Sequence, residues 1–273
     1  MIDVIVLNRN LGSVCDALCI DIESVLGLEV NIVVVDCSTS EELASKRVTV
    51  QADSEAALRD GLRFGRGMNL GINYLLDADS QSDWMLLLPV DTEIVHLGLE
   101  ALVRDLNSVV ELVAVKPMPE GSAYEDLMPI TDFALGWNFE EGPWLLKTGF
   151  VREQIAMSGR DEFFDANNFR GYLTSLELAF RAYANGLCVG TTKNLLLREN
   201  ESYLIEKASL MKTNPLEENH RLFISEGVAW LQSKYGIADP WDFAQLVRLG
   251  FERFLVEHPD EAHISLGGRR NEN

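Results

Sequence analysis

Polar side chains that could bind a small molecule stand directly after three short apolar segments of the chain. The apolar segments cover residues 4–7, 30–35 and 84–88. Carboxylate, amide, hydroxyl and guanidinium groups are the side chains that hydrogen-bond the hydroxyls and phosphates of a ligand. The polar residues at these ends are Asn8, Arg9, Asn10, Asp36, Ser38, Asp91 and Glu93.

The elements that must position these side chains alternate along the first part of the chain. Apolar runs predict buried strands over 4–7, 30–35, 84–88 and 112–115, and apolar residues at helical spacing predict helices over 14–25, 68–76 and 97–106. Ser13 and Asp16 resemble a capping box for the first helix, and Gly27 is expected to end it. This alternation predicts a parallel sheet with helices on both faces, whose ligand lies beyond the carboxyl ends of the strands.

The remainder of the chain is less regular. Residues 116–143 are rich in proline and glycine and predict irregular structure, while 144–147 resume the sheet and 173–185 form a helix. Apolar residues at helical spacing return after residue 200. We therefore expect a single α/β domain over residues 1–200 with a helical C-terminal extension over 201–273.

Charge and composition exclude several classes of partner. The chain has 273 residues, of which 43 are Asp or Glu and 23 are Lys or Arg, for a net charge of −20. A field of this sign disfavours nucleic acid and anionic membranes. A membrane span needs about 20 apolar residues, and no such run is present. The four cysteines form no CxxC pair, so we expect reduced thiols in a cytoplasmic protein without structural zinc.

Five segments, in this order and at compatible spacing, resemble the family 2 glycosyltransferases of the GT-A fold. The segment around Asn69 resembles in particular the rhamnosyltransferase-like branch. The five are VIVLNRN at 4–10, VVDCSTS at 34–40, FGRGMNLGI at 64–72, LLLPVDTE at 86–93, and the stretch from Phe164-Asp165 through Glu177, Arg181 and Gly186.

The resemblance implies a fold and an activity. The fold is a GT-A-like domain with a mostly parallel central sheet flanked by helices, in which residues 1–115 bind the nucleotide and 116–200 the acceptor. The activity is transfer of a sugar, with inversion, from a nucleotide-diphosphate sugar to a saccharide or another hydroxyl acceptor. Such a reaction needs a neutralised diphosphate, a general base and a firm grip on the nucleotide.

For the donor, the resemblance implies that Asp36 accepts a hydrogen bond from the base and that Arg9 stacks on it. Arg66 would face the diphosphate at the start of a helix. Asn8, Ser38 and Asn69 complete the predicted nucleotide-sugar set. Each also has an ordinary role as a turn, loop or backbone-positioning residue.

For the metal, Asp91 is implied as the main ligand of Mn²⁺ or Mg²⁺, with Glu93 as a second candidate. The alternative is that both carboxylates cap a following helix. The segment departs from the family pattern, because Pro89 stands where the family usually has a further aspartate.

The catalytic base is a second departure. Thr174 and Ser175 stand where the family has the Glu-Asp pair that supplies the base, and neither hydroxyl is a base at neutral pH. Glu177 is therefore the first candidate, either paired with Arg181 one helical turn on or turned into a cleft. Asp165 is a weaker substitute on the preceding loop.

Two other interpretations stay open. The chain is alternatively a catalytically inactive member of the fold that binds nucleotide or serves in assembly. A nucleotidyltransferase is the third interpretation, and it would release pyrophosphate from a nucleoside triphosphate.

Overall fold

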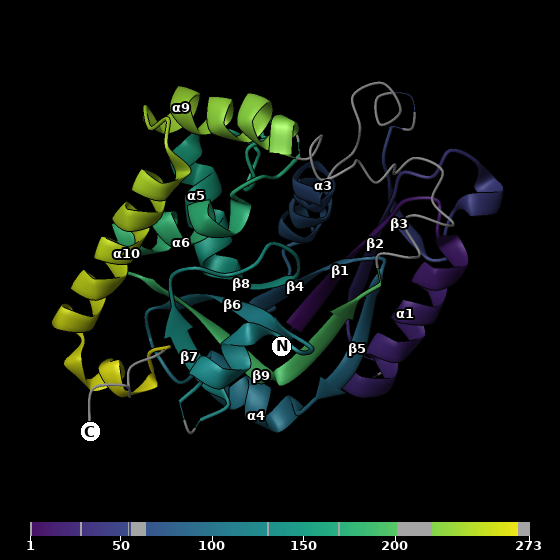
Figure 1. Ribbon diagram of the computed structural model, residues 1–273. Helices are drawn as coiled ribbons and strands as arrows, with labels where there is room; N and C mark the ends of the chain where they lie inside the picture. Colours follow the sequence, from purple (N-terminus) through teal and green to yellow (C-terminus); the bar gives the residue numbers. More distant parts are fainter. Residues whose placement is uncertain are drawn as a thin grey trace. The chain divides into compact units, whose positions relative to one another are not determined.

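The computed structural model describes residues 2–27, 29–53, 55, 64–129, 131–168, 170–200 and 220–266 (Figure 1). The chain forms two compact units and passes repeatedly from one to the other. Unit 1 comprises Met1–Glu93, Leu146–Tyr172 and Glu199–Ala238, and unit 2 comprises Ile94–Leu145, Leu173–Arg198 and Asp239–Asn273. The boundary expected at residue 200 stays a prediction, because the units group segments by contact and not by sequence order.

Unit 1 contains a parallel sheet, whose strands are labelled β1 to β4 in Figure 1. Its strands are β1 (Ile2–Asn8), β2 (Ile32–Asp36), β3 (Val48–Gln51) and β4 (Trp84–Pro89), in the order β3-β2-β1-β4. β1 pairs in parallel with β2 and β4, and β2 pairs in parallel with β3. The three strands predicted from apolar runs are confirmed, and their carboxyl ends meet at one edge as expected.

The helices of unit 1 include two that pack on this sheet. α1 (Gly12–Leu26) contacts β1, and α3 (Phe64–Asp77) contacts β1 and β2. A Cβ atom at Gly67 would lie 2.4 Å from Leu7, and one at Gly71 would lie 2.5 Å from Ile5. These glycines therefore let α3 approach the sheet closely. The other helices in the described part of unit 1 are η1 (Glu41–Leu43), α5 (Thr148–Ser158), η4 (Phe223–Val228) and α9 (Ala229–Tyr235).

The start of α1 differs from the expected capping box. The N-cap residue is Leu11, and no side chain caps the helix. The Asp16 carboxylate instead accepts hydrogen bonds from Ser45 Oγ at 2.6 Å and from the Lys46 backbone N–H at 3.0 Å. The capping-box prediction is wrong because Asp16 is used to hold the loop that follows β2. The end of α1 is as predicted, with Gly27 at φ 97°.

Unit 2 is built around a long strand, β9 (Cys188–Glu199). It pairs in parallel with β6 (Leu112–Pro119) and antiparallel with β7 (Phe133–Gly136), so the sheet is mixed here. The irregular structure predicted for residues 116–143 is thus wrong in part, since it includes the end of β6 and all of β7. The bounds of β5 are Thr92–Leu97 and those of β8 are Trp144–Lys147.

The helices of unit 2 bury aromatic side chains between them. α6 (Thr174–Ala184) packs on α10 (Pro240–Glu257), where the ring of Tyr183 lies 5.6 Å from that of Phe251 and 6.0 Å from that of Phe254. The predicted helix 173–185 is confirmed. The other helices are α4 (Leu99–Leu106), η3 (Ala123–Leu127) and η5 (Pro259–Ile264). Among the described residues, no helix combines the length and the apolar character needed to cross a membrane.

Candidate functional site

The carboxyl edge of β1 and β2 brings together three predicted ligand-binding residues. Asn8 and Asp36 are opposite each other in the pairing of the two strands. The Asn8 amide donates to Asp36 Oδ2 at 2.6 Å and to Ser38 Oγ at 3.1 Å, and all three residues are buried. The sequence prediction that these residues lie together is therefore confirmed, while their role in binding stays a prediction.

Asp36 is the centre of this network. Its Oδ1 accepts from the Ser38 backbone N–H at 2.8 Å, and its Oδ2 accepts from the Ser45 backbone N–H at 3.0 Å in addition to Asn8. The carboxylate therefore fixes the loop between Asp36 and Ser45 against the end of β1. Only the remaining lone pairs of this buried group are left for a ligand.

Two residues beside this network hold buried N–H groups without partners. Arg9 is 8 % exposed and Asn10 is 3 % exposed. Asn10 has a left-handed backbone at φ 62°, and its Oδ1 accepts from the Thr39 backbone N–H at 2.8 Å. Within the part of the chain that the structure describes, neither Arg9 Nε nor Asn10 Nδ2 has a hydrogen-bond partner. Buried donors are normally satisfied, so these two indicate a site for an acceptor group.

Cys37 lies in the same place and is not a nucleophile. Burial raises the pKa of its thiol to about 11, although the positive charge of Arg9 acts in the opposite direction. The thiol is therefore protonated at neutral pH, and the charge of Arg9 is not consumed by a thiolate.

Of the predicted metal residues, Asp91 lies in the turn after β4 and Glu93 lies near the start of β5. Asp91 is 4 % exposed and precedes β5, and its carbonyl oxygen accepts from the Asn200 backbone N–H at 2.8 Å. Glu93 Oε1 accepts from Asn200 Nδ2 at 3.1 Å. The alternative that both carboxylates cap a helix is wrong, because the segment after Asp91 is a strand.

The donor set does not favour a metal held by the protein alone. No group of three His, Cys, Asp or Glu side chains suited to bind a metal occurs among the residues described. Hard divalent cations such as Mg²⁺ prefer several oxygen ligands and accept some of them from a substrate's phosphates. Asp91 and Glu93 are two carboxylates at most, so we assign no chemical step to a metal ion.

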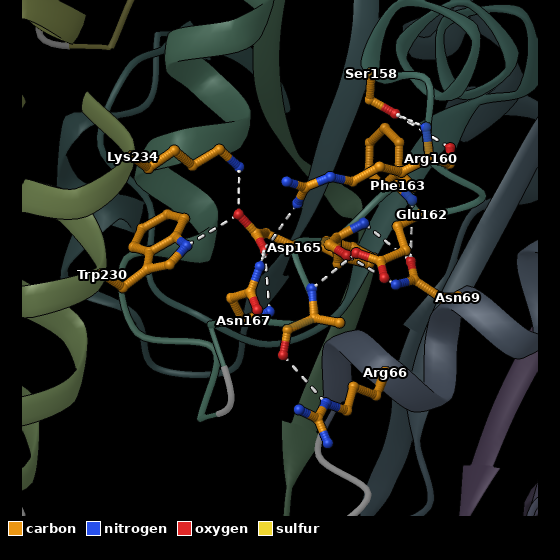
Figure 2. A network of polar contacts seen from close by, with 12 residues as sticks. Arg66, Asn69, Ser158, Arg160, Glu162, Phe163, Asp165, Asn167, Trp230 and Lys234 are labelled. Carbon is orange, nitrogen blue, oxygen red and sulfur yellow. Dashed lines mark hydrogen bonds and ion pairs between the residues drawn. The ribbon is translucent and has the colours of Figure 1, made fainter.

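Arg66 and Asn69 bind the loop that joins α5 to α6, as Figure 2 shows. Asn69 Nδ2 donates to the Phe164 carbonyl at 2.7 Å, and its Oδ1 accepts from the backbone N–H groups of Phe163 and Phe164 at 3.2 and 2.9 Å. Arg66 Nε donates to the Ala166 carbonyl at 3.1 Å. Both side chains therefore position this loop, and their predicted role in donor binding stays a prediction.

Asp165 is held by a cation and an indole from α9 (Figure 2). Its Oδ2 lies 2.9 Å from Lys234 Nζ and accepts from Trp230 Nε1 at 3.1 Å. Burial alone would raise the pKa of this carboxyl, but the hydrogen bonds from Lys234, Asn167 and Trp230 outweigh it and hold the pKa at about 2. Such a carboxylate accepts a proton poorly at neutral pH, and the catalytic role of Asp165 stays a prediction.

Glu177, the other predicted base, is buried on α6 in unit 2. It is 2 % exposed, and its Oε2 lies 3.9 Å from Arg181 Nη2 one helical turn on. Of the two arrangements expected from the sequence, the structure therefore contains the ion pair with Arg181. The catalytic role of Glu177 stays a prediction.

A carboxylate that the sequence analysis did not single out occupies the start of α6. Glu141 Oε2 accepts from both the backbone N–H and the hydroxyl of Ser175, each at 2.9 Å. The indole of Trp144 donates to Ser175 Oγ at 3.2 Å, and the buried Lys116 donates from Nζ to the Glu141 carbonyl at 3.0 Å. Glu141 stands in the irregular segment before Gly142 and Pro143, where no periodicity marks it.

The environment of this carboxylate raises its pKa. The residue as a whole is exposed, but its carboxylate turns inward onto Ser175 at the start of α6. Burial raises the pKa of Glu141 to about 7, against the hydrogen bonds from Ser175 and the charge of Lys116, which lower it. A carboxyl group with this pKa exchanges protons readily at neutral pH.

Comparisons with known proteins support the fold. No protein-family profile matches the sequence, and no curated protein sequence matches it. Among solved structures, GalNAc-T7 with UDP, GalNAc and Mn²⁺ is similar over 97 % of this chain, with a TM-score of 0.56 and 12 % identity. The match covers 59 % of the GalNAc-T7 chain, so this protein spans less than two thirds of its length.

A second similar structure is glucosyl-3-phosphoglycerate synthase from Mycobacterium tuberculosis, in complex with Mn²⁺, UDP and phosphoglyceric acid. It matches 88 % of this chain and 80 % of its own, with a TM-score of 0.48 and 14 % identity. At these identities a likeness concerns the fold alone. The similarity to GalNAc-T7 confirms the expected GT-A-like α/β fold.

Proposed function

We propose that this protein is a glycosyltransferase that takes a sugar from a nucleotide-diphosphate sugar and transfers it, with inversion, to a saccharide or another hydroxyl acceptor. The observation that carries the proposal is a pair of buried N–H groups without hydrogen-bond partners, Arg9 Nε and Asn10 Nδ2, at the carboxyl edge of β1. Arg9 brings a guanidinium and Asn10 an amide to the place where ligands of parallel sheets bind. A diphosphate supplies the acceptor oxygens and the negative charge that these donors lack.

The fold supports the same class of donor. GalNAc-T7, whose fold this chain shares, was crystallised with UDP. The five sequence segments that resemble family 2, and the rhamnosyltransferase-like branch in particular, add the donor residues Asn8, Arg9, Asp36, Ser38, Arg66 and Asn69 to the proposal. Asp91 and Glu93 would meet a Mn²⁺ or Mg²⁺ ion that arrives with the donor phosphates.

The test measures binding of nucleoside diphosphates and nucleotide-diphosphate sugars to the protein. Thermal unfolding with and without Mn²⁺ detects this binding. A ligand at 100 times its Kd stabilises the folded state by about 2.7 kcal/mol, which raises the Tm by several degrees. We expect Arg9→Gln to weaken binding about tenfold, because it removes a charged hydrogen bond. Arg152→Gln is the matched control, since Arg152 is a half-exposed arginine of unit 1 that bonds the Ser80 carbonyl. Unchanged affinity in Arg9→Gln contradicts the proposed donor site.

An inactive binding module is the second candidate, and one observation favours it. Both oxygens of Asp36 already accept bonds from the protein, and the described residues form no three-ligand metal group. This candidate predicts binding of nucleotide without turnover of any sugar donor. Release of pyrophosphate from a nucleoside triphosphate would instead support a nucleotidyltransferase.

A further inference from the structure

We propose that the outer face of α10 binds the same face of a second copy of this chain, with the two helices antiparallel about a two-fold axis. This face belongs to unit 2, whereas the proposed donor residues all belong to unit 1. The face is therefore a site for a partner whether or not the protein transfers a sugar.

Apolar side chains lie on two opposite sides of α10. The inner side packs on α6 (Figure 1), and its buried residues are Phe243, Val247, Phe251 and Phe254. On the outer side, Leu246, Leu249 and Val256 follow one another at spacings of three and seven residues, which places them on one helix face. At about 100° per residue, Trp241 falls about 60° from Val256 and so on the same side. These four residues form the outer stripe of α10.

The outer stripe is exposed along its length. The exposed fraction is 67 % for Trp241, 45 % for Leu246, 58 % for Leu249 and 80 % for Val256. In the part of the chain that the structure describes, no other helix or strand has more than two exposed large apolar residues. Single exposed apolar side chains are ordinary, whereas a cluster of them on one element marks a surface for a partner.

The area of the outer stripe matches what a dimer needs. The four side chains expose apolar surface on the order of 500 Å². A dimer of standard size buries about 800 Å² on each partner, of which about 65 % is apolar in homodimers. The stripe therefore supplies about the whole apolar area that one partner of a stable dimer contributes.

The charges beside the outer stripe fit a second copy of the same helix. Arg248 pairs with Glu252 at 2.8 Å on one flank of the stripe, and Arg253 pairs with Glu257 at 2.7 Å on the other. Each flank thus has one arginine and one glutamate a helical turn apart. In an antiparallel two-fold pair, each flank lies against the same flank of the second copy in the opposite direction, so arginine meets glutamate.

The net charge of α10 disfavours other occupants. Its two arginines and three acids give a net charge of −1, whereas the whole chain has −20. The helix therefore repels a second copy much less than an average part of the surface does. It also lacks the excess of positive charge that attracts an anionic membrane or nucleic acid.

The experiment measures the mass of the full chain in solution by sedimentation velocity over a range of protein concentrations. We expect a dimer for the wild type. Leu249→Glu places a charge in the stripe twice in each dimer, so we expect the dissociation constant to rise about 100-fold or more. Ile20→Glu is the matched control, because Ile20 is an exposed apolar residue of another helix, α1, and its dimer is expected to be as tight as that of the wild type.

A charge swap tests the arrangement and leaves the apolar residues in place. Arg253→Glu puts two acids on one flank against the same two acids of the second copy, so we expect the dimer to weaken about tenfold. The double variant Arg253→Glu with Glu257→Arg reverses the pair but keeps one charge of each sign on the flank. We therefore expect it to regain the wild-type dissociation constant, and circular dichroism checks that each variant is folded.

The outcomes that overturn the proposal are distinct. A wild-type chain that stays monomeric at every concentration overturns it. A dimer of unchanged tightness in Leu249→Glu means that the interface lies elsewhere, and a double variant no tighter than Arg253→Glu rules out the antiparallel arrangement. A monomer that binds phosphatidylcholine vesicles, and loses this binding in Leu249→Glu, would assign the face to a lipid surface and overturn the proposal as well.

Discussion

Two carboxylates, one in each unit, show that the pKa of the same functional group can be lowered or raised by its surroundings. Asp165 of unit 1 accepts bonds from an ammonium and an indole and has a pKa of about 2. Glu141 of unit 2 accepts bonds from Ser175 and from the Thr174 backbone and has a pKa of about 7. Burial raises the pKa of both groups, so the difference comes from their partners. Lys234, Asn167 and Trp230 outweigh burial at Asp165, whereas Ser175, Lys116 and Thr174 do not outweigh it at Glu141.

The comparison separates carboxylates that stabilise the fold from carboxylates that are suited to proton transfer. A carboxylate that is paired with a cation stabilises the fold and resists protonation, as Asp165 does for the loop before α6. A carboxylate that is desolvated without a direct cation costs stability when ionised and is suited to proton transfer. The sequence resemblance put Glu177 first and Asp165 second as the base, and both of these carboxylates lie beside a cation.

The largest loss of stability is expected when Asn69, which anchors the loop of Asp165, is replaced. Asn69→Ala removes three hydrogen bonds and leaves buried backbone groups of Phe163 and Phe164 without partners, so we expect a loss of about 3 kcal/mol in the free energy of unfolding. Urea unfolding measures it. Asn73→Ala is the control, because Asn73 makes one exposed bond to the Asp161 carbonyl. Equal losses in the two variants would contradict the anchoring role.

The next largest loss of stability is expected when Asp165 itself is replaced. Its pKa falls from an ordinary 3.8 to about 2 on folding, which corresponds to about 2 kcal/mol. Because the folded pKa is depressed, this stability is present above pH 4 and is lost as the pH falls towards 2. Asp165→Asn should therefore be less stable than wild type by about 2 kcal/mol at pH 7, with the difference shrinking near pH 2.

Unfolding of Asp165→Asn and of the control Asp161→Asn at pH 7, 4 and 3 checks this prediction. Asp161 lies on the same loop, and its backbone carbonyl, which Asn73 binds, is retained in the variant. A constant difference between Asp165→Asn and wild type over the whole pH range would mean that the ion pair with Lys234 contributes nothing.

The smallest expected change in stability is a gain, and it follows from replacing Glu141. Its pKa rises from 4.5 to about 7 on folding, so its favourable contribution is present below pH 4.5 and is lost as the pH rises through 7. Relative to wild type, Glu141→Gln should gain stability between pH 5 and 8. Since the residue is exposed and screened, the gain is expected to be about 1 kcal/mol. Thermal unfolding of both proteins at pH 5 and at pH 8 measures this gain in stability. A gain that appears only at the lower pH would contradict the raised pKa of Glu141.

The sheet of unit 1 could be predicted from its sequence because its strands are buried on both faces. Val4–Leu7 and Trp84–Leu88 are unbroken apolar runs, and the structure places them in β1 and β4. β3 was missed because it is short and mostly exposed. β9 was missed because threonine, lysine and asparagine interrupt its apolar residues. β5 follows β4 after only two residues, so its acidic start was interpreted as the end of the preceding strand.

The positions of site residues could be predicted where they follow from the direction of the strands. Asn8 and Asp36 end adjacent parallel strands, and so they meet. The roles of Asn69 and Asp165 depend on contacts with segments 65 to 95 residues away, which spacing alone does not reveal. Glu141 reaches Ser175 across 34 positions from a segment without periodicity, and no local signal marks such a contact.

The network around Asp36 has a consequence for how quickly a ligand can be captured. The loop from Asp36 to Ser45 is held by its own hydrogen bonds and by the close contact of Gly12 with the Ala44 carbonyl, where a Cβ atom would lie 2.1 Å away. A ligand arriving beside Arg9 meets donors that are already oriented, so little chain entropy is lost on association. Capture at this edge should then be governed by diffusive encounter, and differences in affinity among donors should be found mainly in their rates of escape.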